Sequence, residues 1–452
     1  MKNKSNSTLI AGYIAFEQTI NLKNCDLSGY SHLSRFNGNK SKAIHRWFTY
    51  KEGFSSELLS WASGQIGLEL DGMNAILDPF CGVGTSLLSA QMTYRGDHQL
   101  LAVGVERNPF IAFVARTKLN WPYYKANRIK RLIPKLVGAI ETRPRAKYEL
   151  AELSTIQNQE VFNRRKLYDM LYARDLIQSE LNNTPEHDFF LLGWSSIIEE
   201  VSNLRKDGRA LRFVEKETRA PVHKLLKQKW ESMLGDLVQL NSKAFGEIGN
   251  KVTHKILEGD GRRLEGIDNI SKMYNLIIYS PPYLNNIDYS EVYKLELWLC
   301  GFVKKQVDFR NLRMSTLRSH PSIKFPETDF VDKLPSTCWP KRLRESLIAA
   351  IPQDEDYNWR VRLVRAYMDD LLVSLQRQYQ AIESGGFVIC VVGNSLHGGK
   401  GNNIPIATDL LISAMGRVVG FKVEQLRVTR QLSRRANNDH LLRESIIIMR
   451  RP

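Results

Sequence analysis

The sequence has few cysteines and no long apolar run. Its five cysteines are scattered and form no Cys-x-x-Cys pair: Cys25, Cys81, Cys300, Cys338 and Cys390. This pattern supports neither a disulfide framework nor a zinc site and is typical of a reducing cytosol. No stretch approaches the roughly 18 apolar residues of a membrane-spanning helix, and no apolar signal segment follows the N-terminus. We therefore expect a soluble, cytoplasmic protein without a bound metal.

Acidic residues are too few to balance the basic ones. Lys and Arg number 64 against 48 Asp and Glu, which leaves a net charge of +16. Such an excess favours a polyanionic partner, with nucleic acid as the first candidate, although a generally basic protein is the alternative. Hydrophobic residues make up 43% of the chain and charged residues 25%, as in globular proteins. The 452 residues suffice for two or three domains.

A glycine turn follows a short expected strand over residues 74–78. It reads Pro79 to Thr85, and its glycines Gly82 and Gly84 allow close approach of a ligand to the backbone. The turn lacks the first and third glycines of the dinucleotide fingerprint and the Gly-Lys-Ser/Thr of a phosphate loop. Asp78, at the strand end, would repel a pyrophosphate and attract a cation. A ligand with an adenosine and a positive charge, but no phosphates, is S-adenosyl-L-methionine.

A second expected strand, residues 101–106, ends in the carboxylate of Glu106. An acid in this position, about 20 residues beyond the turn, can accept both ribose hydroxyls of a bound nucleoside. A surface glutamate that happens to follow a strand is the alternative. The order of strand, turn, helix, strand and acid favours the ribose contact.

A run of four apolar or aromatic residues, 276–279, stops at the tetrapeptide Ser280-Pro281-Pro282-Tyr283. A proline pair cannot continue a ladder, so the tetrapeptide must lie where the strand leaves the sheet, which is where open α/β sheets bind ligands. Two prolines fix φ and remove two donors, which leaves rigid carbonyls at Ser280 and Pro281. Beside them, Tyr283 offers a flat face. The arrangement suits a planar base with an exocyclic amine, and an ordinary strand-ending turn is the alternative.

Together these motifs resemble those of a known enzyme family. The glycine turn and the tetrapeptide are similar to the paired motifs of the amino-group DNA methyltransferases, which use S-adenosyl-L-methionine to modify cytosine N4 or adenine N6. Residues 45–62 resemble the helix that precedes the turn on the cofactor side. The resemblance implies a set of cofactor-binding residues: Asp78, Pro79, Phe80, Gly82, Gly84 and Thr85 in the turn, Glu106 on the ribose and Asp260 on the adenine.

The resemblance also implies the fold. We expect a Rossmann-like methyltransferase sheet, mostly parallel with a C-terminal antiparallel hairpin and with helices on both faces. Residues 41–124 and 251–452 would form this domain. Residues 125–250, rich in charged residues and Leu at helical spacing, are predicted to be a helical insertion and a candidate DNA-binding region. Residues 1–40 are interpreted as a loosely structured lead-in.

Contacts to DNA are expected from three segments. Basic residues in the insertion and after Lys304 are candidates for phosphate contacts, although a basic run is often only a solvated face. The segment after the tetrapeptide lies within reach of its ligand. The candidates are Asn285, Asp288 and Tyr289 beside the tetrapeptide, Arg205, Arg209 and Arg212 in the insertion, and Arg310, Arg313 and Arg318 in the later segment.

The resemblance implies methyl transfer to the N4 amine of cytosine in double-stranded DNA, with a cognate restriction endonuclease as a partner and a nucleoid-associated location. Hydrogen bonds from the amine to Ser280 and to the Pro281 carbonyl would restore its lone pair, and the flipped base would stack on Tyr283. The Pro-Cys nucleophile of a ring-carbon methyltransferase is absent from the sequence. In this family Ser before Pro-Pro-Tyr tends to accompany cytosine. Three alternatives stay open: an N6-adenine enzyme, an RNA amino-methyltransferase and a non-catalytic DNA-binding subunit.

Overall fold

The computed structural model of the chain describes residues 2–24, 30–144, 148–207, 210–216, 220–241, 251–267, 273–284, 287–321, 325–352, 358–397, 404–432 and 441–452. Among these residues no helix is both long enough and apolar enough to cross a membrane.

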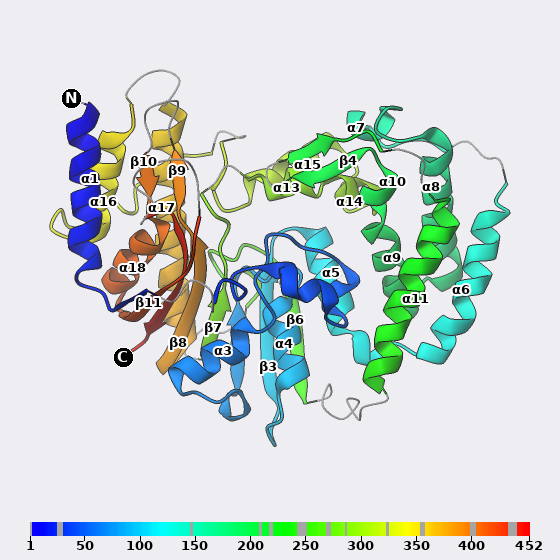
Figure 1. Ribbon diagram of the computed structural model, residues 1–452, viewed down its shortest axis with the longest axis horizontal. Helices are drawn as coiled ribbons and strands as arrows, with labels where there is room; N and C mark the ends of the chain where they lie inside the picture. Colours follow the sequence, from blue (N-terminus) through cyan, green and yellow to red (C-terminus); the bar gives the residue numbers. More distant parts are fainter. Residues whose placement is uncertain are drawn as a thin grey trace.

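A mixed sheet runs through the middle of the molecule (Figure 1) and has eight strands in the part of the chain that the structure describes. In spatial order they are β6 (Val252–Glu258), β3 (Leu100–Glu106), β2 (Ala75–Asp78), β7 (Tyr274–Tyr279), β8 (Ile382–Gly393), β12 (Arg443–Arg450), β11 (Lys422–Gln431) and β1 (Leu22–Asn24). The first five pair in parallel, whereas β12 runs antiparallel to both β8 and β11. The predicted Rossmann-like sheet and its C-terminal antiparallel hairpin are thereby confirmed.

The central strands are buried on both faces. Every residue of β7 is buried, as expected for a parallel strand that is covered on both sides. Leu276 and Ile278 point into one hydrophobic cluster, whereas Ile277 and Tyr279 point into the other, because side chains alternate along a strand.

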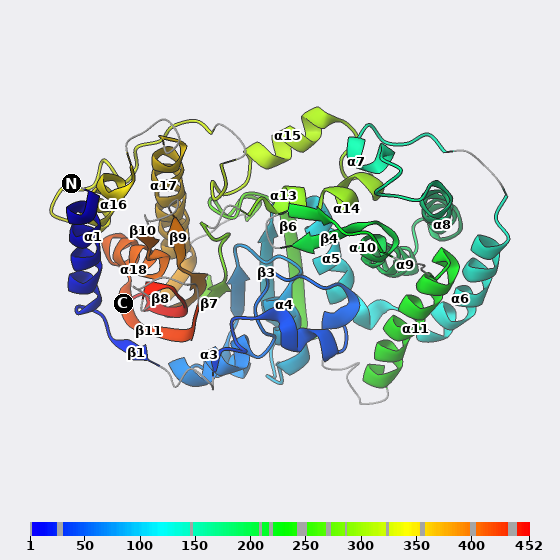
Figure 2. The same cartoon turned by 45° about the horizontal axis from the view of Figure 1, so that its top comes forward.

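Helices cover the two faces, as predicted (Figures 1 and 2). The first cluster packs the sheet against α3 (Leu58–Ile66), α4 (Thr85–Thr93) and α5 (Pro109–Leu119). The second packs it against α1 (Lys2–Glu17), α16 (Trp339–Ala350), α17 (Asn358–Ala381) and α18 (Thr408–Val419).

The described residues between 125 and 241 are mainly helical, but they also contain a β-hairpin that we did not predict. The helices are α6 (Ala126–Glu141), α7 (Ser154–Gln157), α8 (Arg164–Leu181), α9 (Pro185–Ser196), α10 (Ile198–Val201) and α11 (Val222–Asn241). The hairpin consists of β4 (Leu204–Asp207) and β5 (Ala210–Phe213). Along β4 buried and exposed side chains alternate, and the buried Lys206 forms an ion pair with Glu296. This alternation spans only four residues, too few to stand out among the helical patterns around it.

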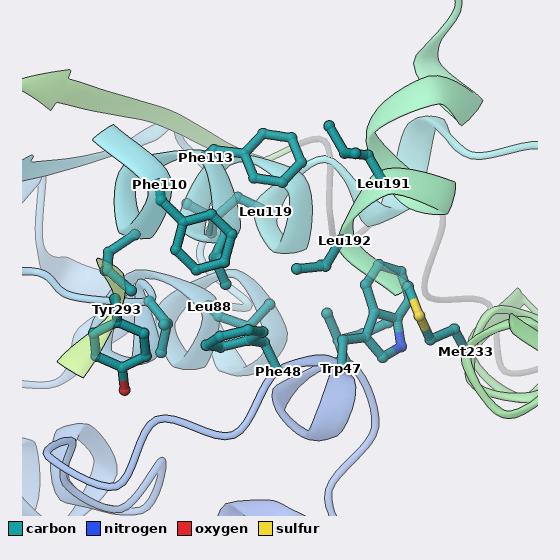
Figure 3. Close-up of a cluster of buried hydrophobic side chains, with 14 of the residues drawn as sticks. Trp47, Phe48, Leu88, Phe110, Phe113, Leu119, Leu191, Leu192, Met233 and Tyr293 are labelled. Atoms are coloured by element: carbon teal, nitrogen blue, oxygen red, sulfur yellow. The ribbon is translucent and has the colours of Figure 1, made fainter. Parts of the chain in front are cut away.

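The helical insertion shares a hydrophobic core with the sheet. In Figure 3, Leu191 and Leu192 of α9 face Phe113 and Leu119 of α5, and Trp47 lies between Leu192 and Met233. A buried carboxylate reinforces the contact, because Asp236 of α11 accepts hydrogen bonds from the Trp47 indole at 3.0 Å and from the Ile44 amide at 3.0 Å. The insertion is therefore joined to the sheet by apolar packing and by satisfied polar groups.

The N-terminal segment differs from the expected loose lead-in. Residues 2–17 form α1, which buries Leu9, Tyr13 and Phe16 against α16 and α18. Their spacing of four and three residues is that of one helix face, but the polar residues between them obscured it in the sequence. The strand β1 then adds in parallel to the edge of β11. This segment closes the far edge of the sheet.

Candidate active site

The pocket lies where the strand order of the sheet reverses. From β2 the chain continues to β3 on one side, whereas β7 lies on the other side of β2. The carboxyl ends of β2 and β7 therefore open onto a topological switch point, the usual ligand site of such sheets. A pocket of about 990 Å³, including its open mouth, occupies this place.

The glycine turn forms one wall of the pocket. Gly82 has φ +52°, and a Cβ added there would lie 3.1 Å from the ring of Tyr50. Its amide donates to Glu106 Oε2 at 3.0 Å, which connects the turn to the end of β3. Pro79, Phe80 and Thr85 line the pocket beside it. Glycine at position 82 is therefore needed both for the backbone conformation and for the space.

The carboxylate of Glu106 lies at the centre of this wall. Besides the Gly82 amide, it accepts the Asn108 amide on Oε1 at 2.8 Å. Burial raises the pKa of Glu106 to about 7. The two carboxylate oxygens together have four acceptor sites, and the backbone amides of Gly82, Asn108 and Arg107 use at most three of them, so acceptor capacity is left for a hydroxyl group in the pocket.

Asp78 and Gly84 support the turn from behind. The Asp78 side chain is buried, where it accepts the Phe80 amide at 3.1 Å and the Ser86 hydroxyl, and burial raises its pKa to about 7. Gly84 precedes α4 with φ +76°, and an added Cβ would lie 3.2 Å from the Cβ of Ala115. Of the residues predicted in this turn, these two are not part of the pocket lining.

Asp260 lines the pocket and is paired with Arg262, which was not among the predicted site residues. Its carboxylate accepts from Arg262 Nε at 2.9 Å and from Nη2 at 2.8 Å. Arg262 in turn donates to Asp370 of α17 at 2.8 Å. Between them Gly261 permits the close approach, because an added Cβ would lie 1.9 Å from the carbonyl oxygen of Pro79. The Gly-Asp-Gly-Arg-Arg run was the signal for this turn, but Asp370 is too distant in sequence to have been linked to it.

The tetrapeptide also lines the pocket. Ser280, Pro281 and Pro282 line the pocket together with Gly82, Glu106 and Asp260, so the structure brings the separate motifs into one site. The Pro282 carbonyl accepts the Tyr367 hydroxyl at 3.0 Å. That bond holds the proline pair against α17.

A second hollow adjoins the first and is lined by the aromatic end of the tetrapeptide. Tyr283 lies there together with Glu444, Arg35 and Lys51. Three residues line both spaces: Glu52, Gly53 and Tyr289. Glu52 and Gly53 lie within the segment 45–62 that was predicted to form a helix on the cofactor side. The helix α3 begins only at Leu58, so the part of the segment at this junction is not helical.

Two of the predicted DNA contacts are instead held in ion pairs. Arg318 is buried and donates to Asp370 through Nε at 3.0 Å and Nη2 at 2.8 Å. Arg313 donates to Asp288 at 2.6 Å and is also paired with Glu291. Their acidic partners are supplied by other helices, so a run of basic residues in the sequence did not indicate free charge.

The remaining candidates differ in exposure and role. Asp288 caps α13 (Tyr289–Val292) by accepting the amides of Ser290 and Glu291. Arg310 is exposed on α15 (Gln306–Met314). Arg205 and Arg212 are exposed and lie opposite each other in the β4–β5 hairpin, where Arg212 forms an exposed ion pair with Asp207. The candidates Asn285 and Arg209 lie outside the described residues.

Comparison with known proteins finds two relatives that are both type II methyltransferases. The chain is 25% identical to the Type II methyltransferase M.BsoBI of Geobacillus stearothermophilus over 480 aligned positions, which cover 93% of this chain and 88% of that protein. It is 24% identical to the Type II methyltransferase M.AvaI of Nostoc sp., with 87% and 82% covered. The chain is a homologue of type II methyltransferases. No family model matches it. The likeness spans nearly the whole chain, so it is not confined to one motif.

The raised pKa of Glu106 predicts how its ionisation affects stability. The folded protein holds this proton more tightly than an unfolded chain does, because the pKa rises from 4.5 to about 7. The contribution of this bound proton to the free energy of unfolding is fully present below pH 4.5 and is lost as the pH rises to about 7. In Glu106→Gln the free energy of unfolding should therefore fall less between pH 5 and pH 8 than in the wild type, as measured with denaturant. Asp97→Asn, at an exposed carboxylate, is the control; a Gln variant with the wild-type slope would contradict the assignment.

Proposed function

We propose that the chain is an S-adenosyl-L-methionine-dependent DNA methyltransferase that modifies the N4 amine of cytosine in double-stranded DNA, as the modification enzyme of a restriction–modification system. The observation that carries the proposal is the meeting of Ser280-Pro281-Pro282 with Gly82, Glu106 and Asp260 around one pocket. The homology to type II methyltransferases supports it. A separate restriction endonuclease for the same sequence is the partner that this role implies.

The residues present fit the cofactor. Gly82 leaves space that a side chain would fill, and the buried Glu106 retains acceptor capacity suited to a ribose hydroxyl. Asp260 lies in the same pocket as an acceptor for an adenine amine, although its oxygens also serve Arg262. The rings of Tyr50 and Phe80 offer flat apolar surface. When bound here, S-adenosyl-L-methionine supplies a methyl group on a positively charged sulfur.

The tetrapeptide then prepares the nucleophile. An exocyclic amine is a poor nucleophile while its lone pair is delocalised into the ring. Ser280 and the Pro281 carbonyl accept its two N–H groups and draw the nitrogen toward a tetrahedral geometry, which returns the lone pair to the nitrogen. The proline pair keeps these acceptors rigid, so orientation supplies much of the acceleration.

The target base must leave the duplex to reach this place, as bases do in enzymes that modify them. Tyr283 lies in the hollow beside the pocket and offers the face on which such a base can stack. Arg35 and Lys51 line the same hollow and suit the phosphates that flank a flipped nucleotide. The exposed Arg205 and Arg212 extend the basic surface to the β4–β5 hairpin. Cytosine, in preference to adenine, rests on the resemblance of Ser-Pro-Pro-Tyr to the family's cytosine type.

The product of the reaction tests the function. Purified protein is incubated with methyl-labelled cofactor and duplex DNA, and the DNA is digested to nucleosides for mass spectrometry. We expect N4-methylcytosine as the labelled product, and a large loss of it in Ser280→Ala because one of the two acceptors is gone. Parallel incubations with RNA and without nucleic acid are the controls. N6-methyladenine alone would refute the choice of base, label in RNA alone would refute the DNA substrate, and cofactor binding without transfer would favour a non-catalytic role.

Arg205 and Arg212 of the β4–β5 hairpin should contribute to DNA affinity through their charge alone. We expect the double variant Arg205→Ala/Arg212→Ala to bind cognate and unrelated duplexes more weakly by a similar factor, since phosphate contacts carry no sequence information. The slope of log affinity against log salt should become shallower by about 0.9 for each lost contact. Fluorescence anisotropy at several salt concentrations measures both. The matched control removes two exposed cations on other elements, Lys333 and Lys422. A double variant with the original slope would assign the hairpin arginines to a solvated face.

A further inference from the structure

A chain of hydrogen bonds leads from the tetrapeptide to a buried ion pair. The Ser280 hydroxyl donates to Tyr283 Oη at 3.2 Å, and the Tyr283 hydroxyl donates to Glu444 Oε1 at 3.1 Å. The other oxygen of Glu444, Oε2, accepts Arg430 Nε at 2.6 Å. Glu444 lies on β12 and Arg430 on β11. The series of hydrogen bonds that begins at Ser280 therefore ends in the C-terminal hairpin.

The carboxylate determines the direction of every bond in this chain. The side chain of Glu444 is 4% exposed and ion-paired with Arg430, and a carboxylate can only accept. Tyr283 must therefore donate its single hydroxyl hydrogen to Glu444, and it can only accept from Ser280. Ser280 in turn has used its own hydrogen. The Ser280 hydroxyl therefore has only its oxygen lone pairs available, so it can only accept a hydrogen bond from a ligand.

The packing around Tyr283 keeps this geometry in place. Glu444 lies directly opposite Gly393 of β8 in the sheet register. A Cβ added at Gly393 would lie 3.0 Å from Cε2 of Tyr283, so the ring lies close against the backbone of β8. Burial, reinforced by the charge of Glu444, raises the pKa of Tyr283 and keeps its hydroxyl protonated. The tyrosine is thus held as a donor toward Glu444.

We propose that Glu444 is a positioning residue which, through Tyr283, fixes the Ser280 hydroxyl as an acceptor toward the target amine. The inference rests on the proposed function of the site and adds to it a residue about 160 positions away from the tetrapeptide. In this arrangement Ser280 cannot turn its hydrogen toward the ring nitrogen next to the amine. The Ser280 hydroxyl accepts a hydrogen bond from the target amine, as a carboxylate or amide oxygen at this position would.

The alternative role for Glu444 is a structural one, in which its pair with Arg430 only fastens β11 to β12. The two roles predict different results for Glu444→Gln. A carboxamide can present its NH₂ to Tyr283, which then accepts and can turn its own hydrogen to Ser280. The polarity of the chain is reversed while its shape is retained, and Ser280 loses its fixed acceptor role. A purely structural pair would affect stability and leave catalysis unchanged in the folded enzyme.

The test compares Glu444→Gln, Tyr283→Phe and the double variant with the wild type in steady-state kinetics on cognate duplex DNA. We expect kcat to fall about ten- to a hundredfold in each single variant, the size of one hydrogen bond to a charged group, with a small change in KM for DNA. The double variant should fall no further than the singles, because both interrupt the same chain. Calorimetric affinity for S-adenosyl-L-methionine should stay at the wild-type value. Glu424→Gln on β11 is the matched control, at a surface glutamate paired with Lys422.

Two results would overturn the positioning role. One is an unchanged kcat in Glu444→Gln, and the other is a double variant in which the two losses multiply. Tyr283→Phe retains the aromatic face and removes only the hydroxyl, so it tests the chain even if Glu444→Gln does not fold. Failure of DNA methyl transfer as such gives a different result, because the wild type itself would then transfer no methyl group to DNA, and that would overturn both.

Discussion

The parallel pairing of β2 with β7 is the constraint on which the site depends. It sets Ile76 beside Leu276 and Leu77 beside Ile277, so that the strands end side by side. The glycine turn leaves one strand and the tetrapeptide leaves the other. A shift of one residue in this register would turn every side chain of the strand to the opposite face. Because β7 is buried on both faces, the register is strongly specified, and with it the separation of the two motifs.

Close backbone contacts then shape the pocket that this pairing opens. Gly82 faces the Tyr50 ring, Gly261 lies against the Pro79 carbonyl, and Gly393 lies against the ring of Tyr283. In each case a Cβ would approach a neighbour at 3.1 Å or less. Polar side chains behind these contacts hold the groups that face the ligand, as Arg262 does for Asp260. The residues predicted to touch the ligand thus depend on partners that do not.

The sequence alone predicted the parts of the site that are encoded locally. The strand ends carrying Glu106 and Asp260, the glycine turn and the tetrapeptide were found because each is a short run with its own chemistry, and the structure places them around one pocket. The Rossmann-like sheet and its last hairpin were implied by the resemblance of these motifs to those of the amino-group DNA methyltransferases. The short hairpin of β4 and β5 and the mixed surface of α1 were missed because their patterns are brief or interrupted by polar residues.

What the sequence could not show are the pairings between distant residues. Arg318 reads as a free basic residue, yet its side chain is buried against Asp370, 52 positions away. Glu444 reads as the polar start of a strand, yet it completes a hydrogen-bond chain with Tyr283, 161 positions earlier. The sequence gives the position of each charged residue along the chain. Which of these charges pair with each other depends on the fold.

The most direct test of the central claim is single-molecule methylome sequencing of DNA from a methylation-deficient host that expresses the protein. This measurement reports the modified base and its sequence context together. The account predicts N4-methylcytosine at one recurring sequence, present with the wild type and strongly reduced with Ser280→Ala. A genome that carries only N6-methyladenine, or no new modification despite folded protein in the cell, would contradict it.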